Sequence, residues 1–408
     1  MKGQTMVKRR RRGTARPSIA CRIWIVVAGL LTLVSPAWSE SGVTDTEILL
    51  GSCSALEGPA NFLGTQTVLG AKAYLNHVND QGGVHGRQIK LIAYDDSYEP
   101  AKAIECFNRL KQESVFAAAF FVGTPTGAKH APMAESAKIP LIGLFTGAQL
   151  LHDPFKRYVI NVRASYYDEA REQVDNLWNG MGMRKVGVIY QDDAFGVTVL
   201  EGVKQALKKY NAAPVAQGSF PRNTLDVNRG IELVRAANPE AVVMVGPYAP
   251  IAEIVKRGRA AGWNPLYLTV SFVGTEAFIK AAGKDGEGTV ITQVVPPYNR
   301  TDLPSVAFYH EALKKYFPEA QPNFVSLEGF VDAMVVVEGL KRAGRTLTRE
   351  KLIEAIESIK DLDIGLGPQL KLTYGPQDHK GFDTVYYTVV HDDQAVVFTD
   401  WTQLRTSR

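Results

Sequence analysis

Two pairs of neighbouring carboxylates stand where apolar runs of the sequence end, Asp95 with Asp96 and Asp192 with Asp193. Paired acids at strand ends could act as general acids and bases or bind a metal ion. Acids in such positions also cap helices and accept hydrogen bonds from loop amides, and we expect that simpler role. The seven histidines are scattered, and we expect His152, which precedes an acid, to be an ordinary surface residue.

Signature motifs of several enzyme classes are missing from the chain. No Gly-x-Gly-x-x-Gly follows a strand pattern, and there is no Gly-Lys-Ser/Thr phosphate loop, Gly-x-Ser-x-Gly, His-Glu-x-x-His or Cys-x-x-Cys. The first absence argues against a nicotinamide-dependent dehydrogenase. We therefore expect a protein that is not an enzyme and that holds no metal or cofactor.

The first 39 residues read as an export signal. They carry eight Lys or Arg residues and no acid ahead of an apolar run from Ile23 to Val34, and Ala37-Trp38-Ser39 suits a signal peptidase. A membrane anchor is the alternative, but the run is shorter than the roughly 20 residues that span a bilayer. We expect a cleaved signal peptide over 1–39, by a general or a twin-arginine route, and a periplasmic mature protein without a membrane anchor.

The basic character of the chain belongs to this leader. The full sequence has 46 basic and 42 acidic residues, and removal of the eight leader cations leaves 38 against 42. A mature chain with slightly negative net charge has no global electrostatic attraction to nucleic acid or to an anionic membrane. We expect neither as a partner.

Two cysteines remain after cleavage, Cys53 in a predicted strand and Cys106 in a predicted helix. An oxidising compartment would permit a disulfide bond between them. Apolar neighbours such as Ile104 and Phe107 favour the other interpretation, two buried free thiols, and we expect that state.

Alternating apolar strands and amphipathic helices position these residues. Residues 47–96 contain a strand, a helix and a second strand, with loops at the carboxyl ends where open parallel sheets bind ligands. Further strands are expected at 115–122, 139–145, 158–162, 185–190, 241–245, 266–270 and 289–295. This alternation predicts parallel sheets covered on both faces. Residues 163–169 and 296–298 look like crossings between two lobes, and short strands after 365 complete one of them.

An ordered series of motifs along the mature chain resembles periplasmic solute-binding proteins of the Leu/Ile/Val-binding type. The matching segments are Glu57-Gly58-Pro59, residues 79–86 leading into Tyr94-Asp95-Asp96, Ile139-Pro140-Leu141-Ile142, residues 188–192 with Phe195-Gly196, and Gly381-Phe382-Asp383. The resemblance implies an α/β fold of two doubly wound lobes with parallel-sheet cores, joined by three crossover segments. It implies an N-terminal lobe of 40–165 plus 297–383 and a C-terminal lobe of 166–296 plus 384–408.

The resemblance also implies a receptor that closes on a small-molecule ligand and presents it to an ABC permease in the inner membrane, and we expect a monomer. On the first lobe it implies ligand contacts from Phe62, Leu63, Thr124, Phe145, Thr146 and Gly147. A hydroxyl and free backbone N–H groups at a helix start, as at Thr124, suit a carboxylate.

On the second lobe the resemblance implies contacts from Phe195, Tyr248 and Ser271, with Asp168 near the first crossing. Ser271 departs from the family pattern, because many amino-acid binders of this type have a Glu there that holds the ligand's α-ammonium. Either Asp168 holds the ammonium here or the ligand has none. We favour the second, which widens the ligands from branched-chain amino acids to aromatic or aliphatic carboxylates and small amides.

Two other functions remain open on the sequence. A sensory receptor of the same fold would pass its closed form to a signalling protein instead of a permease. A secreted α/β enzyme that uses Asp95, Asp96 or His152 is the third interpretation, and it predicts turnover of a substrate.

Overall fold

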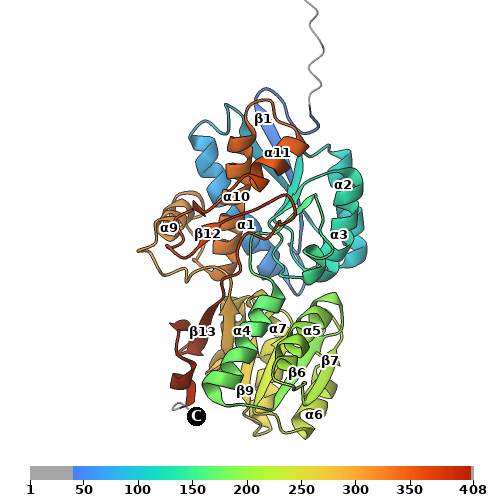
Figure 1. Cartoon of the computed structure of the whole chain (residues 1–408), viewed down its shortest axis with the longest axis vertical. Helices are drawn as coiled ribbons and strands as arrows, with labels where there is room; N and C mark the ends of the chain where they lie inside the picture. Colours follow the sequence, from blue (N-terminus) through green and yellow to red (C-terminus); the bar gives the residue numbers. More distant parts are fainter. Residues whose placement is uncertain (1–39, 406–408) are drawn as a thin grey trace, which may run out of the picture. The chain divides into compact units, whose positions relative to one another are not determined.

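The computed structural model describes residues 40–405 (Figure 1). The predicted signal peptide and its cleavage site lie outside this range. No helix within the described range is long and apolar enough to cross a membrane.

The first sheet has five parallel strands in the order β2-β1-β3-β4-β5. These are β1 (Glu47–Ser54), β2 (Gln88–Asp95), β3 (Ala117–Ala119), β4 (Leu141–Ile142) and β5 (Val159–Ile160). The helices that pack on it are α1 (Asn61–Asp80), α2 (Pro100–Gln112), α3 (Thr124–Ala137), α9 (Pro304–Tyr316), α10 (Phe324–Ala343) and α11 (Arg349–Glu357). Ala117 and Ala119 face the core with α1 and α10, whereas Ala118 faces α2 and α3, because successive side chains of a strand point to opposite faces.

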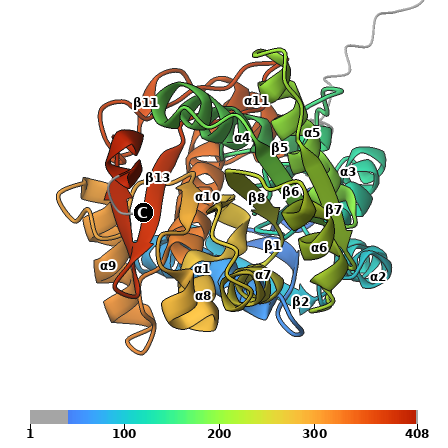
Figure 2. The same ribbon diagram turned by 90° about the horizontal axis from the view of Figure 1, so that it is seen from below.

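The second sheet has seven strands in the order β14-β13-β10-β9-β8-β6-β7. The parallel strands are β6 (Val186–Gln191), β7 (Ala216–Phe220), β8 (Ala241–Val245), β9 (Leu266–Thr269) and β10 (Val290–Gln293), and β13 (Tyr386–His391) and β14 (Gln394–Phe398) are antiparallel. Helices α4 (Tyr166–Asp175) and α5 (Ala194–Lys208) cover one face (Figure 2). The other face is covered by α6 (Asn228–Ala236), α7 (Tyr248–Ala260) and α8 (Thr275–Ala282).

The two sheets with helices on both faces confirm the predicted fold class of two α/β lobes. The chain passes between the lobes after β5, after β10 and before β13. A two-stranded ribbon of β11 (Leu362–Asp363) and β12 (Lys371–Leu372) follows α11, and then β13 and β14 join the second sheet.

The prediction of two free thiols was wrong. Cys53 on β1 and Cys106 on α2 form a disulfide bond, with their Cα atoms 5.9 Å apart. Both residues are buried, as their apolar neighbours indicated. The pairing follows from α2 packing over β1, which brings the two Cα atoms within the 4.4–6.8 Å that a bridge requires. Local sequence reports burial but not this proximity.

Candidate functional site

Thr124 and Thr146 form a hydroxyl pair on the first lobe. Their Oγ1 atoms lie 2.7 Å apart and both side chains are buried. Gly123 precedes α3 with a φ of +103°, a conformation that favours glycine, and no side chain caps the first turn of the helix. Gly147 follows Thr146, and its carbonyl accepts a hydrogen bond from the Tyr166 amide. The hydroxyl pair therefore lies beside an uncapped helix start. The one O–H not used within the pair and the free backbone N–H groups of the helix start can donate to an anion.

Five aromatic rings form a buried aromatic cluster between the lobes. Phe272 is at its centre, with ring centroids 4.6 Å from Phe195, 5.6 Å from Phe145 and 5.9 Å from Tyr98. Tyr166 packs on Phe195 at 5.1 Å. The structure thus brings the predicted Phe145 and Phe195 together. Tyr98 and Phe272 were not predicted as site residues, although each stands in the loop that follows a strand, three residues after the strand ends, a position that could have identified them.

The other predicted apolar contacts meet at a second place between the lobes. The rings of Phe62 and Tyr248 are 6.2 Å apart in an edge-to-face arrangement, and the Tyr248 hydroxyl donates to Asn61 Oδ1 at 3.1 Å. Leu63 is buried, and a Cβ added to Gly274 would lie 2.6 Å from Leu63 Cδ2. At this point the two lobes are in direct side-chain contact.

Asp168 lies at the start of α4, where it completes a capping box with Ser165. It also pairs with Arg171 at 2.9 Å and with Lys380, which belongs to the third crossing. Burial alone would raise the pKa of Asp168, but hydrogen bonds from Lys380 and Ser165 outweigh it and hold the pKa below its usual value. Asp168 is therefore a structural carboxylate with two cationic partners.

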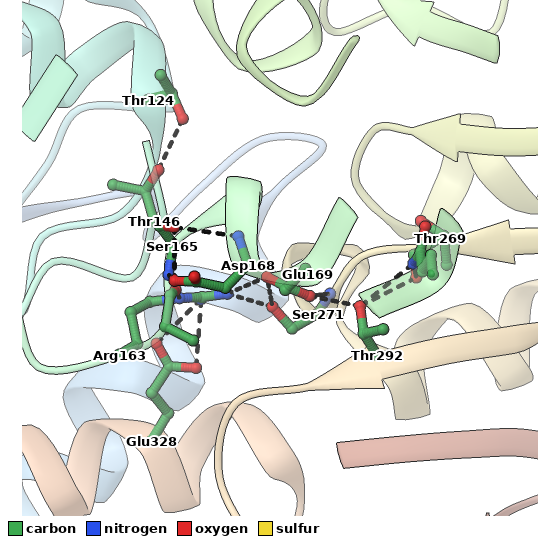
Figure 3. A network of polar contacts seen from close by, with 12 residues as sticks. Thr124, Thr146, Arg163, Ser165, Asp168, Glu169, Thr269, Ser271, Thr292 and Glu328 are labelled. Carbon is green, nitrogen blue, oxygen red and sulfur yellow. Dashed lines mark hydrogen bonds and ion pairs between the residues drawn. The ribbon is translucent and has the colours of Figure 1, made fainter. Parts of the chain in front are cut away.

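Ser271 contacts a buried charge cluster, of which Figure 3 shows Arg163, Glu169 and Glu328. Buried Asp332, which interacts electrostatically with Glu328 and Arg163, is the fourth charged member. Glu169 accepts hydrogen bonds from the Ser271 amide at 2.8 Å and from the Ser271 hydroxyl at 2.9 Å. The Arg163 guanidinium joins Glu169 at 2.9 Å to Glu328 at 3.1 Å and also bonds to Ser271. Position 271 is thus a serine and not an acid, but Glu169 of α4 places a carboxylate beside it.

Electrostatics within the charge cluster follow from one cation facing three carboxyl groups. Burial lowers the pKa of Arg163, but Glu328 and Glu169 outweigh it and hold the guanidinium charged. Burial raises the pKa of Glu328 to about 7, and it raises that of Asp332 well above its usual value. Sequence reasoning missed all four residues. The predicted crossing 163–169 begins with Arg163 and ends with Glu169, and these opposite charges could have identified the two residues as an ion pair.

One acid of each pair at the strand ends, Asp95 and Asp193, has the structural role that we expected. Asp95 Oδ1 accepts the amides of Leu56 and Glu57, each at 2.9 Å, and Asp193 caps α5 by accepting the Phe195 amide. His152 lines a separate cavity by the first crossing. Within 40–405, three side chains with metal-ligand spacing, Glu287, His391 and Asp392, are all exposed.

Comparisons with known proteins agree with this architecture. Residues 47–395 match the periplasmic binding protein family. Leu/Ile/Val-binding protein homolog 3 of Brucella melitensis is 23% identical over 340 residues, 83% of this chain and 90% of the relative. A possible leucine/isoleucine/valine-binding protein from Rhodopirellula baltica has a solved structure that is 34% identical, with a TM-score of 0.82 over 87% of this chain and 96% of that one. A fatty acid ABC transporter substrate-binding protein from Thermomonospora curvata is 24% identical and shares the fold, with a TM-score of 0.80 over 89% of this chain and 94% of that one. The chain therefore belongs to the periplasmic binding protein family, as a solute-binding protein of the Leu/Ile/Val-binding type and not an enzyme.

Proposed function

We propose that this protein is an extracytoplasmic receptor of an ABC importer that captures a small carboxylate without an ammonium group. The ligand would lie between the lobes, among the hydroxyl pair and the aromatic cluster. The observation that carries the proposal is that the acidic groups beside this place are already paired with cations of the protein itself.

Glu169 has no free capacity for a ligand cation. An ionised carboxylate accepts about four hydrogen bonds. Glu169 accepts four, from the Ser271 amide, the Ser271 hydroxyl, the Thr292 hydroxyl and the Arg163 guanidinium. A ligand ammonium would have to displace one of them, and separating the buried ion pair would cost about 3–5 kcal/mol. In this proposal Arg163 is the permanent counter-ion of the acid.

The Asp168 carboxylate is likewise already bonded to groups of the protein. Ser165, Arg171 and Lys380 all donate to its carboxylate. The hydroxyl pair is different, since Thr124 and Thr146 bond to each other and each oxygen keeps a further site. The ligand's negative charge is therefore best accommodated at the first lobe, and the five rings suit an aromatic or branched aliphatic body.

The same proposal extends to the protein's surroundings. A ligand that binds the closed arrangement preferentially would shift the lobes toward closure, and that form would be presented to the permease. Contacts between the lobes that belong to a closed arrangement include Tyr98 to Gln191 at 3.2 Å and Arg222 to Glu99 at 2.5 Å. We propose lobes of 40–165 plus 297–383 and 166–296 plus 384–408, a periplasmic location and a monomer.

Matched pairs of compounds test the ligand class. Isothermal titration calorimetry of the mature protein should compare 4-methylpentanoate with leucine, and 3-phenylpropanoate with phenylalanine. Each pair differs by the ammonium group alone. We expect one or both acids to bind at least tenfold more tightly than the matching amino acid. Tighter binding of either amino acid would contradict the proposal, and loss of that binding in Asp168→Ala or Glu169→Gln would identify the residue that holds the ammonium.

A further inference from the structure

A small cavity of about 160 Å³ lies at the joint between the crossings, apart from the hydroxyl pair and the aromatic cluster. One wall comes from the segment that holds Leu151, His152 and Phe155, and another from the first crossing with Asn161. The segment before the third crossing, which ends at Lys380, closes it. An apolar cavity of about 150 Å³ holds benzene, so this space suits a molecule of roughly six heavy atoms.

Asn161 is one of the lining residues, and its side chain carries a buried acceptor that is unused. Its side chain is 2% exposed, and its Nδ2 donates to the Leu151 carbonyl at 3.2 Å, which sets the orientation of the amide. Its backbone N–H donates to His379, and its carbonyl accepts from Tyr374 and Gly381. Its Oδ1 has no hydrogen-bond partner among residues 40–405. Since an unsatisfied buried acceptor destabilises a protein, a hydrogen-bond donor that reached it from the cavity would be favourable.

His152 offers a second unused polar atom. Its Nε2 is buried and finds no partner within the described part of the chain. Burial lowers the pKa of His152 to about 4, with a further contribution from the Lys380 charge, so the ring is neutral near pH 7. A neutral imidazole nitrogen either donates or accepts, according to the tautomer.

The walls carry charges of both signs, from Lys156, Asp378 and Lys380. The Lys380 ammonium pairs with Asp168 and keeps further N–H groups, so it can donate to a neutral carbonyl group. An anionic ligand would place its oxygens against Asn161 Oδ1, which is also an acceptor. A neutral molecule with an N–H donor next to a carbonyl acceptor could donate to Asn161 Oδ1 and accept from the Lys380 ammonium.

We propose that this cavity is a second binding site, which takes a small neutral primary carboxamide of about six heavy atoms. The amide N–H would donate to Asn161 Oδ1, and the carbonyl would accept from Lys380 Nζ or His152 Nε2. The alkyl part would lie against Leu151, Phe155 and Val159, which are also in the wall. This site is independent of the ligand proposed for the interface between the lobes.

Isobutyramide is the probe, and 3-methylbutan-2-one has nearly the same shape without an N–H donor. Histidine-ring NMR of the mature protein, with His152 assigned from a His152→Gln variant, should follow titration of each compound to 100 mM. We expect a saturable shift of the His152 signal with the amide and at least tenfold weaker binding of the ketone. A non-saturating response, or equal binding of the two compounds, would overturn the proposal on the wild-type protein alone.

Two variants locate the binding. Asn161→Leu removes the acceptor at similar volume and should abolish the saturable shift, whereas Thr124→Val alters the hydroxyl pair and should leave it unchanged. Loss in Thr124→Val with retention in Asn161→Leu would assign the amide to the other site and refute the second one. A crystal soaked in isobutyramide provides a direct check, and ordered water alone in the cavity would also refute it.

Discussion

The hydroxyl pair lies on the first lobe and the charge cluster includes the first crossing, and the two groups use their polar atoms in opposite ways. Thr124 and Thr146 bond to each other and each retains hydrogen-bonding capacity. Arg163, Glu169 and Glu328 bond among themselves and to Ser271, and Glu169 has no lone pair left. The hydroxyl pair is therefore suited to ligand binding and the charge cluster to structural stability. A group can bind a ligand only if the protein's own hydrogen bonds have not used all its donor and acceptor sites. The more highly charged region is therefore the less available one.

The charge cluster also joins elements that are distant in the sequence. Arg163 lies on the first crossing, Glu169 on α4 and Glu328 on α10, so one guanidinium connects helices that pack on different sheets. A buried pair of this kind adds little net stability compared with apolar residues, but it is costly to break. The comparison with the hydroxyl pair thus predicts large stability effects on one side and large binding effects on the other.

The largest expected effect is that of Arg163→Met on stability. Removal of the guanidinium leaves Glu169 and Glu328 buried without their counter-ion, and we expect the free energy of unfolding to fall by about 3–5 kcal/mol. Urea denaturation followed by circular dichroism measures it. Arg171→Met is the matched control, because Arg171 is 47% exposed in its ion pair with Asp168 and should cost at most about 1 kcal/mol. Equal losses of unfolding free energy in Arg163→Met and Arg171→Met would contradict the special role of the charge cluster.

The next effect concerns binding at the hydroxyl pair. Thr124→Val and Thr146→Val each disrupt the hydroxyl pair, whose one O–H not used in the mutual bond can donate to a bound carboxylate. A hydrogen bond to a charged group is worth about 1.5–3 kcal/mol, so we expect affinity for the preferred acid to fall about 10- to 100-fold. Calorimetry should include the corresponding neutral amide, for which the loss should be smaller. If acid and amide lose the same factor, the carboxylate does not lie at this pair. The free energy of unfolding of the variants shows whether either change acts through stability instead.

The charge cluster should also make the free energy of unfolding depend on pH, whereas the hydroxyl pair has no group that titrates in this range. The pKa of Glu328 is raised by burial from 4.5 to about 7, so the folded protein binds an extra proton between these values. This contribution to stability is fully present below about pH 4.5 and is lost as pH rises through 7. The stability of the wild type relative to Glu328→Gln should therefore fall by at least about 1 kcal/mol between pH 5 and pH 8, since one pKa unit corresponds to about 1.4 kcal/mol. Parallel urea-denaturation profiles over this range would contradict it.

The smallest expected effect is that of Asp332→Asn near pH 7. Burial and the charge of Glu328 raise the pKa of Asp332 well above its usual value, which favours the neutral acid, and Asn resembles that form in shape and charge. We expect a change in unfolding free energy below about 1 kcal/mol, a common size for an isosteric substitution that leaves no new charge unpaired. A loss similar to that of Arg163→Met would mean that Asp332 is ionised and belongs to the ion-pair network.

The parts of the site that sequence could predict are those that depend on local pattern. Thr124 follows a strand and opens a helix, and Phe145 and Phe195 stand directly behind strands or at a helix start, so periodicity and turn residues place them near the ligand edge of a parallel sheet. Phe272 and Tyr98 occupy equivalent positions and could have been found in the same way. Their arrangement as one cluster around Phe272 could not, because it depends on how far the lobes approach each other.

The alternation of strands and helices and the residues at the strand ends follow from the sequence alone, since short segments of chain encode them. The two-lobed fold was predicted from the order of such segments along the whole mature chain. Only the tertiary structure decided the partners. Arg163 meets Glu328 across 165 positions and Glu169 meets Ser271 across 102, while Cys53 bonds to Cys106 although local sequence favoured free thiols. The packing of segments that are distant in the sequence decides which buried acid pairs with which buried cation. These pairings determine which acids remain free to bind a ligand, and no local sequence pattern predicts them.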